Sequence, residues 1–381
     1  MNPASEKPKS ILADGDQAVS FAELFFDLVF VFSITQVVHL FHDGFDLAHA
    51  GKVILVFWLV WWAWTQFTWA LNAADTTHQW IQLGTLLTTA LAFFMAIGVP
   101  EAFSSQALWF AVSYVAVRSI GLLIYLWVSW VDPKMRAAVR LFSAVSILGL
   151  MAVIAGGILG GTLQYWLWGL GIGLDIMAAA LGGKADGWNL HPGHFAERHG
   201  LFIIIALGET LIVAAGGISS ASWNFSLLAV AILSVGISGC LWWIYFSKAK
   251  DKLEHIMAQK KDAEQSTMAR DTYSLFHFPM LFGLIVYAYA INECISHPDL
   301  PLTINGRIAL ALGIFCFSGG LIVVMWRATG KIEWIKLGLT LITTGLVLGI
   351  SHMTVIWTML AALGGLMVLC IMEEIIPSVE D

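Results

Sequence analysis

Two carboxylates near the start of the chain lie inside a segment that is long and apolar enough to cross a membrane. Glu23 and Asp27 are four residues apart in FAELFFDLVFVFSITQVVHLF, residues 21–41, so they share one face of a helix. A carboxylate at the centre of such a helix costs about 2.5 to 3.5 kcal/mol on insertion scales. The pair could attract cations or protons at one membrane edge, or a buried arginine or a neighbouring helix end could hold it in a structural role.

A second set of charges could compensate these carboxylates. Arg118 lies inside the apolar segment 106–130 and, because arginine keeps its proton, it needs a partner when it is desolvated. Asp27 is one candidate partner, and Asp175, at a similar depth in the segment 162–182, is the other. We expect a mainly structural cluster of Asp27, Arg118 and Asp175.

A third set lies in HPGHFAERHGLFIIIALGET, residues 191–210. Arg198 and Glu209 are eleven residues apart, so they lie on one stripe of a helix, about three turns from each other. A glutamate at this depth is a candidate for an ion or proton path, or for a hydrogen-bonded contact between helices. Together with Glu23, Asp27 and Glu197, these residues form the predicted polar path.

The same stretch holds the weakest candidates for a metal site. His191, His194 and Glu197 recur every three residues, and imidazole and carboxylate groups bind divalent metals. Because Pro192 and Gly193 interrupt a regular helix between the two histidines, capping and interfacial hydrogen bonds are favoured, and we expect no metal and no cofactor.

The motifs of phosphate loops, serine hydrolases and dinucleotide sites are absent, so we expect no enzyme; an intramembrane enzyme acting on a lipid is a third alternative.

The elements that must position these residues are membrane helices. The 381 residues are 59% hydrophobic and 12% charged, with a mean hydropathy of +0.80, which is typical of an integral membrane protein. Because about 20 apolar residues span the bilayer, the chain is expected to be all-α, a polytopic transmembrane helical bundle of about twelve helices. They are predicted at residues 21–41, 50–70, 82–99, 106–130, 137–158, 162–182, 198–217, 223–246, 273–295, 305–326, 333–351 and 353–372.

The distribution of positive charge predicts the topology. With a cytoplasmic N-terminus, sixteen of the nineteen Lys and Arg residues fall on the inside, as loops retained in the cytoplasm require. Lys52 and Arg307 fall outside, and Arg118 lies within a helix. Both termini are therefore expected in the cytoplasm of a bacterial inner membrane. The inside residues are Lys7, Lys9, Lys134, Arg136, Arg140, Lys184, Arg198, Lys248, Lys250, Lys252, Lys260, Lys261, Arg270, Arg327, Lys331 and Lys336.

The two halves of the chain resemble each other. FAE at residues 21–23 recurs at 195–197, and WWAW at 61–64 is echoed by WWIY at 242–245. We therefore predict two six-helix repeats, residues 1–183 and 184–381, the second with a cytoplasmic insertion at 248–271 that forms a surface helix. Six is an even number, so the repeats are parallel and related by an axis along the membrane normal.

The charge and composition of the chain limit the classes of partner that it can bind. The net charge of -7 leaves no basic face for nucleic acid. The expected partners are the lipid bilayer and a small ion or solute, and a duplicated chain could act alone or pair into a homodimer.

Three sets of motifs resemble those of the bacterial low-temperature-requirement A family: ELFFDLVFVFSITQ at residues 23–36, the WW-x-[WY] pairs at residues 61–64 and 242–245, and HFAERHGLFIIIALGET at residues 194–210. The family pattern usually reads E-R-F-G-L-F at the last motif; His199 replaces the aromatic residue here, so no role is carried to this position. The resemblance covers nearly the whole chain. It implies a polytopic inner-membrane protein from a family named for a cold-growth phenotype, and it implies no defined substrate.

A fainter resemblance concerns the first helix alone. FDLVF at residues 26–30, followed by Ser33, Ile34 and Thr35, looks like the first helix of the endosomal and bacterial potassium channels marked by R-x-x-x-F-S-D. The arginine before Phe26 and the serine beside the aspartate are absent. The resemblance implies that the first and seventh helices are the central pair.

These observations lead to one main function and a rival. We expect the protein to move a small ion or solute along an axis lined by the first and seventh helices, with Glu23 and Asp27 at the cytoplasmic mouth and Glu209 at mid-membrane. The alternative is a membrane sensor or scaffold that transports nothing, in which the buried charges only tie helices together.

Overall fold

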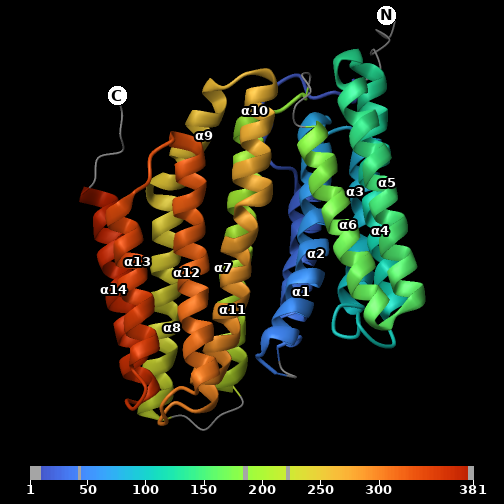
Figure 1. The fold of residues 1–381 in the computed structure, drawn as a ribbon. Helices are drawn as coiled ribbons and strands as arrows, with labels where there is room; N and C mark the ends of the chain where they lie inside the picture. The colour runs from blue at the N-terminus through green and yellow to red at the C-terminus, as the bar shows by residue number, and fades with distance from the viewer. Residues whose placement is uncertain (1–9, 42–43, 183–187, 220–223, 376–381) are drawn as a thin grey trace, which may run out of the picture. The chain divides into compact units, whose positions relative to one another are not determined.

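The computed structural model describes residues 10–41, 44–182, 188–219 and 224–375, and within these ranges the chain is built from helices (Figure 1). Twelve of the described helices have 16 residues or more, which confirms the predicted fold class. Their bounds are α1 (Phe21–His39), α2 (Leu47–Ala73), α3 (Gln79–Ile97), α4 (Ala107–Val131), α5 (Arg136–Leu159), α6 (Gly161–Gly182), α7 (Pro192–Ser219), α8 (Phe225–Ile244), α11 (His277–Ser296), α12 (Ile304–Thr329), α13 (Trp334–Gly349) and α14 (Val355–Ile375).

Eleven of the described helices are long and apolar enough to cross a membrane, and α13, with 16 residues, is a shorter apolar helix. The chain is therefore a multi-pass membrane protein. The largest difference from prediction is at α7, which begins at Pro192, six residues before the predicted start at 198. Proline fits the first position of a helix because its missing N–H has no partner there in any case. Pro192 thus opens the helix and does not interrupt it.

The contacts divide the chain into two compact units, described separately below. Unit 1 takes in residues 1–33, 58–198 and 260–267, and unit 2 takes in residues 34–57, 199–259 and 268–381. Helices α1, α2 and α7 contribute residues to both units. The predicted repeat boundary between residues 183 and 184 lies outside the described residues, as do Lys7, Lys9 and Lys184, so the two six-helix repeats stay a prediction.

In unit 1, helices α3 to α6 pack in chain order, each against the next (Figure 1, teal to green). Close packing of α5 on α6 depends on Gly156, where an added Cβ would lie only 2.6 Å from Cδ1 of Trp168. The Trp168 indole fills this space and donates its Nε1–H to the Val153 carbonyl at 3.0 Å. Small residues permit such close approach between membrane helices.

In unit 2, helices α11 to α14 also pack in chain order, and α14 packs on α8 (Figure 1, orange to red). Helices α11 and α12 approach each other at two glycines. A Cβ added to Gly283 would lie 2.7 Å from the Gly313 carbonyl oxygen, and one added to Gly313 would lie 2.9 Å from that of Gly283. This crossing therefore has no room for a side chain.

The insertion at 248–271 is helical, but it is not one separate surface helix. A π-helical segment, η2 (Tyr245–Ala249), continues α8 into α9 (Lys250–Gln259). After α10 (Asp262–Ala269), a second π-helical segment, η3 (Arg270–Leu275), precedes α11. Leu253 and Met257 of α9 are buried, and α9 packs on α12 in unit 2. The apolar spacing in this insertion thus reflects packing on protein as well as the predicted surface position.

Candidate functional site

The site begins at the N-terminus of α1, in unit 1, where Ser20 and Glu23 form a capping box. The backbone N–H and the Oγ–H of Ser20 each donate to Glu23 Oε2 at 2.9 Å, and the Glu23 N–H donates back to Ser20 Oγ at 3.3 Å. This reciprocal pattern satisfies backbone donors that have no partner within the helix. It also directs the other oxygen of Glu23, Oε1, toward α7.

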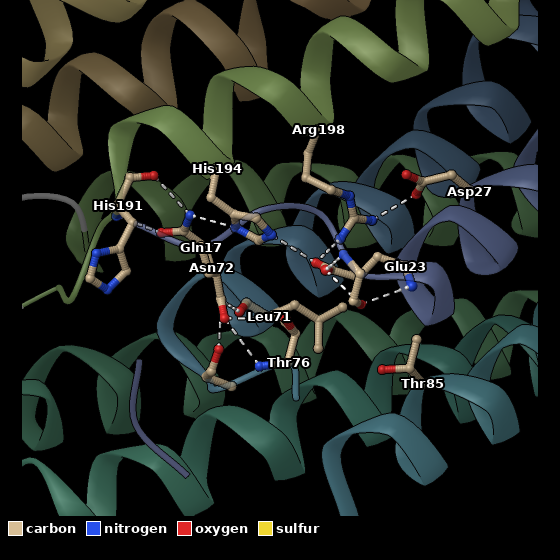
Figure 2. Close-up of polar contacts among 12 residues, drawn as sticks. Gln17, Glu23, Asp27, Leu71, Asn72, Thr76, Thr85, His191, His194 and Arg198 are labelled. Carbon is tan, nitrogen blue, oxygen red and sulfur yellow. Dashed lines mark hydrogen bonds and ion pairs between the residues drawn. The ribbon is translucent and has the colours of Figure 1, made fainter. Parts of the chain in front are cut away.

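Arg198 of α7 binds both carboxylates of α1. Its Nη1 donates to Glu23 Oε1 at 2.6 Å and its Nη2 donates to Asp27 Oδ1 at 2.7 Å. Figure 2 shows the guanidinium between the two acidic side chains. Arg198 and Asp27 are 0% exposed and Glu23 is 1% exposed, so these charge-assisted hydrogen bonds form away from water.

Only one of the two carboxylate oxygens of Asp27 accepts hydrogen bonds from the described residues. Trp64 of α2 donates its Nε1–H to the same oxygen, Oδ1, at 2.7 Å, and the guanidinium carbon of Arg198 lies 5.6 Å from the centre of a Trp64 ring. The second oxygen, Oδ2, is buried and has no hydrogen-bond partner among the described residues. A buried acceptor in this state marks a position where a proton or another ligand can bind.

His194, one turn before Arg198, is held in a single tautomer by Asn72 of α2. The backbone N–H of His191 donates to Asn72 Oδ1 at 2.8 Å, which fixes the orientation of the amide. Asn72 Nδ2 therefore faces the His191 carbonyl and His194 Nδ1, both at 3.0 Å. Because Nδ2 is a donor, His194 Nδ1 must accept, so the ring hydrogen lies on Nε2 and is donated to Glu23 Oε1 at 3.0 Å.

This network carries an uncompensated negative charge. Glu23 and Asp27 contribute two negative charges and Arg198 one positive charge, while the Asn72 contact holds His194 neutral. His191, just before the membrane helix, adds no charge, because burial lowers the pKa of its imidazole. A buried net charge of -1 is costly, so the site favours the uptake of one proton or cation.

The segment before α1 covers the network within unit 1. Gln17 donates to the Ala74 carbonyl at 2.8 Å and accepts from the Thr76 backbone N–H at 3.2 Å, so it holds the end of α2 (Figure 2). Asp16 accepts from the His194 backbone N–H at 3.3 Å. An acidic residue at this position also complements the positive end of the α7 dipole.

The predicted partnership of Arg118 is confirmed for Asp175 and wrong for Asp27. Arg118 donates from Nη1 and Nη2 to the two oxygens of Asp175, at 2.9 Å and 2.8 Å, and from Nη1 to Tyr114 Oη at 2.6 Å. The pair links α4 to α6 in unit 1 and both residues are buried. Asp27 pairs with Arg198 instead, so the three-residue cluster does not form.

Glu209 lies in unit 2, in the second half of α7. Thr35 of α1 donates its hydroxyl to Glu209 Oε2 at 2.7 Å. The other oxygen, Oε1, is buried without a hydrogen-bond partner, and Glu209 forms no ion pair with any residue that the structure describes. Thr210 beside it bonds to Ser238 of α8 at 2.9 Å.

The side chains of two predicted site residues take no part in these networks. Glu197 is exposed on α7 and makes no ion pair within the described ranges. The His191 ring points away from His194 (Figure 2), and both ring nitrogens of His194 already face protein partners. The structure therefore does not bring His191, His194 and Glu197 together, and the described residues hold no group of three ligands that could bind a metal.

Comparison with known proteins bears on this arrangement. The family model described as "Bacterial low temperature requirement A protein" matches residues 18–372. The chain belongs to this family. An uncharacterized protein of Rhizobium meliloti (strain 1021) is 30% identical over 322 residues, which cover 81% of this chain and 76% of that protein. No solved structure matches the chain.

In this low-temperature-requirement A protein, two of the motifs that carry the family resemblance supply the charged residues of the buried network. ELFFDLVFVFSITQ forms most of α1 and supplies Glu23 and Asp27, and HFAERHGLFIIIALGET extends from the start of α7 past its middle and supplies His194 and Arg198. Residues of these two motifs are therefore in direct contact.

The roles of Ser20, Asn72 and Trp64 in the site were not predicted from the sequence. Ser20 carried a readable signal, the S-x-x-E capping box. Trp64 was recognised only as part of a WW-x-[WY] pair, and Asn72 carried no signal, because a polar or aromatic residue in an apolar helix does not reveal which distant side chain it will contact. Only the packing of α2 on α1 and α7 shows that they fix His194 and Asp27.

Proposed function

We propose that this low-temperature-requirement A protein moves protons across the bacterial cytoplasmic membrane along α1 and α7, with Asp27 as a proton-binding group. The observation that carries the proposal is the buried network of Glu23, Asp27 and Arg198, which has a net charge of -1 and leaves Asp27 Oδ2 without a hydrogen-bond partner among the described residues. One proton on Oδ2 removes the excess charge.

A proton fits this position better than a metal cation does. Hard cations take six or more oxygen ligands, whereas the described surroundings of Asp27 offer one free carboxylate oxygen. Glu23 has no such vacancy, because His194, Arg198 and Ser20 together donate four hydrogen bonds to its two oxygens. A proton needs only the single acceptor that Asp27 provides.

Glu209 is the second proton-binding group of the proposed path. It contacts Thr35 of α1, so the two helices meet there within unit 2 as they do at Arg198 within unit 1. Like Asp27, Glu209 has one buried oxygen without a described partner, so it can also take up a proton.

The predicted repeat gives a further argument for this helix pair. Thr35 lies twelve residues after Glu23 and Glu209 lies twelve residues after Glu197, so the two residues occupy equivalent positions after the FAE motifs. Equivalent residues of two repeats can touch only near the axis that relates them. The Thr35–Glu209 hydrogen bond therefore supports α1 and α7 as the helices that line the predicted axis.

The cytoplasmic position of both termini is part of this proposal. Clusters of positive charge, such as Lys134 with Arg136 and Lys248 with Lys250, lie at or beyond helix ends that the twelve-helix order assigns to one side. Fusion of alkaline phosphatase to the C-terminus tests this. The proposal expects an inactive fusion, because this reporter is active only outside the cytoplasm, and an active fusion contradicts it.

The complete burial of the network favours the rival function, a membrane scaffold. Arg198 ties α1 to α7 with short hydrogen bonds and no exposed surface, as a purely structural ion pair would. In this second candidate function Asp27 holds the helices together and transports nothing.

Proton flux into liposomes separates the two functions. The purified protein is reconstituted with a pH-sensitive dye inside and a potassium gradient with valinomycin as the driving force. We expect flux in the wild type and in the control Glu101→Gln, an exposed carboxylate in a loop, and no flux in Asp27→Asn or Glu209→Gln proteins of unchanged thermal stability. A wild type that conducts no protons under any gradient contradicts the proposal and supports the scaffold.

A further inference from the structure

An apolar groove opens on the surface of unit 2 between α11, α12 and the start of α13. It has room for about 350 Å³, which is within the range of small-ligand sites, about 300 to 1,000 Å³. None of the residues that line it carries a charge, and none belongs to the proposed proton path. Phe315 and Trp326 of α12, both in the lining, are 37% and 45% exposed, so the groove faces the surroundings of the protein.

The groove follows α12 through the depth of one lipid leaflet. Its lining extends from Phe315, near the middle of α12, to Trp326 in the last turn of that helix. Eleven residues of helix rise about 16 Å, and half of the hydrocarbon core of a bilayer is about 15 Å thick. Exposed tryptophans such as Trp326 and Trp334 mark the level of the lipid headgroups. The groove therefore matches an extended acyl chain of one leaflet in length and in polarity.

The headgroup end of the groove has a surplus of positive charge. Asp271 accepts from Arg270 Nε on Oδ1 and from Arg327 Nε on Oδ2, both at 2.8 Å. One carboxylate thus serves two guanidiniums, which leaves a net charge of +1. Arg327 directly follows Trp326, and Phe276 of the lining donates its backbone N–H to the Asp271 carbonyl at 3.0 Å. The three charged residues therefore lie at the mouth of the groove.

Two cations at this mouth have donors for a ligand. The Arg327 side chain is 36% exposed, and its Nη1 and Nη2 make no hydrogen bond with the described residues. Lys331, directly before Ile332 of the lining, is exposed and forms no ion pair within the described ranges. Glu333, close to Lys331 in the chain, pairs with Lys336 at 3.1 Å.

The surplus of charge persists when the neighbouring ion pairs are included. Lys336 also binds Glu373 at 2.6 Å, so this lysine serves two carboxylates. Four cations and three carboxylates in this region give a net charge of +1; they are Arg270, Arg327, Lys331, Lys336, Asp271, Glu333 and Glu373. A ligand that fits carries a negative group at one end and a long apolar chain.

We propose that this groove binds an anionic phospholipid of the surrounding membrane. One acyl chain lies in the groove along α12, and Arg327 and Lys331 bind the phosphate at its mouth. A guanidinium can bind a phosphate through two parallel hydrogen bonds. A headgroup with one negative charge, such as that of phosphatidylglycerol, balances the surplus of +1, and basic residues at a membrane surface attract such lipids. This site is independent of the proposed proton movement.

Native mass spectrometry of the detergent-purified protein tests the headgroup end with phosphatidylglycerol and with zwitterionic phosphatidylcholine of the same chains. We expect phosphatidylglycerol to bind the wild type at least ten times more tightly. Arg327→Gln and Lys331→Gln should each lose most of this preference, and Arg270 still neutralises Asp271 in the first variant. The control Lys134→Gln, at an exposed lysine of unit 1, should keep it. Equal binding of the two lipids, or equal losses in the control, overturns the proposal.

A second set of measurements tests the apolar part of the groove. A Cβ built on Gly319, which lines the groove, has no neighbour closer than 3.8 Å, so Gly319→Leu fills the groove without displacing protein atoms. We expect it to weaken phosphatidylglycerol binding at least tenfold at an unchanged unfolding temperature without lipid. Gly239→Leu is the matched control, because Gly239 is exposed on α8 with nothing within 4 Å of such a Cβ, and it should bind the lipid as the wild type does.

A soluble phosphate separates a lipid site from a phosphate site. Glycerol 3-phosphate carries the phosphate but no acyl chain, and it should not compete at concentrations that saturate the lipid. Full competition by this compound, or unchanged lipid binding by Gly319→Leu, contradicts a lipid site.

Discussion

The guanidinium of Arg198 and the carboxylate of Asp27, 171 positions apart in the chain, form an ion pair of 2.7 Å that is closed to solvent. The same guanidinium also binds Glu23, so one cation serves two anions. Because His194 is held neutral by Asn72, this ion pair belongs to a group that is short of one positive charge.

Replacing Arg198 by Gln leaves two carboxylates buried without a counter-charge. Removing one partner of a buried pair typically costs about 3 to 5 kcal/mol, so we expect the unfolding temperature of the purified protein in detergent to fall strongly. Neutralising both acids in the same protein, as Arg198→Gln with Glu23→Gln and Asp27→Asn, should restore much of the loss. An Arg198→Gln protein as stable as the wild type would show that the charges are not buried together.

We expect the Arg118–Asp175 ion pair to stabilise the fold as a self-contained pair. Arg118→Leu leaves Asp175 buried and unpaired, and we expect a loss of stability of about 3 to 5 kcal/mol. Arg118→Leu with Asp175→Leu should be more stable than either single variant, because no buried charge remains. Thermal unfolding of the four proteins gives the coupling between the two residues. Additive losses in the double variant are the outcome that excludes a direct pair.

The histidine tautomer can be observed directly. Nitrogen NMR of protein labelled at histidine should show His194 with its hydrogen on Nε2, because Asn72 Nδ2 faces Nδ1 at 3.0 Å. In Asn72→Asp the new carboxylate accepts from Nδ1, so that nitrogen should become protonated. His191→Gln identifies the second histidine signal of this region. A hydrogen on Nδ1 of His194 in the wild type would contradict this tautomer, and hydrogens on both ring nitrogens would contradict a neutral His194.

The α11–α12 crossing should not tolerate a methyl group. Gly283→Ala places a carbon 2.7 Å from the Gly313 carbonyl oxygen, so the helices must separate, and we expect a lower unfolding temperature. Gly345→Ala on α13 is the matched control, because nothing lies within 4 Å of a Cβ built there, and it should leave the temperature unchanged or slightly raised. Equal effects in the two variants would mean that the close approach is not required.

The sequence predicts the helices well because hydropathy over some 20 residues is a local property, and each long helix was expected near its observed place. The Arg118–Asp175 pair was also predictable, because a buried charge without a partner is costly and these two opposite charges lie at similar depths in apolar helices. The partner of Asp27 was not, because spacing within α1 shows which face it occupies but not which helix covers that face.

The start of α7 explains why Arg198 was not recognised as this partner. With a predicted start at 198, the arginine looked like a residue of the membrane edge. The helix begins at Pro192, which places Arg198 almost two turns inside and brings His194 onto the same face. Polar residues in the first turns lower the local hydropathy, so the true start was hidden until the packing was known.

Infrared difference spectroscopy of the purified protein in lipid tests most directly whether Asp27 takes up a proton. The account predicts a carbonyl stretch of a protonated carboxylic acid in the wild type that disappears in Asp27→Asn and is unchanged in Glu101→Gln. A wild-type spectrum whose carboxylic acid bands are the same in Asp27→Asn would contradict it, because Asp27 would then be a permanently ionised partner of Arg198.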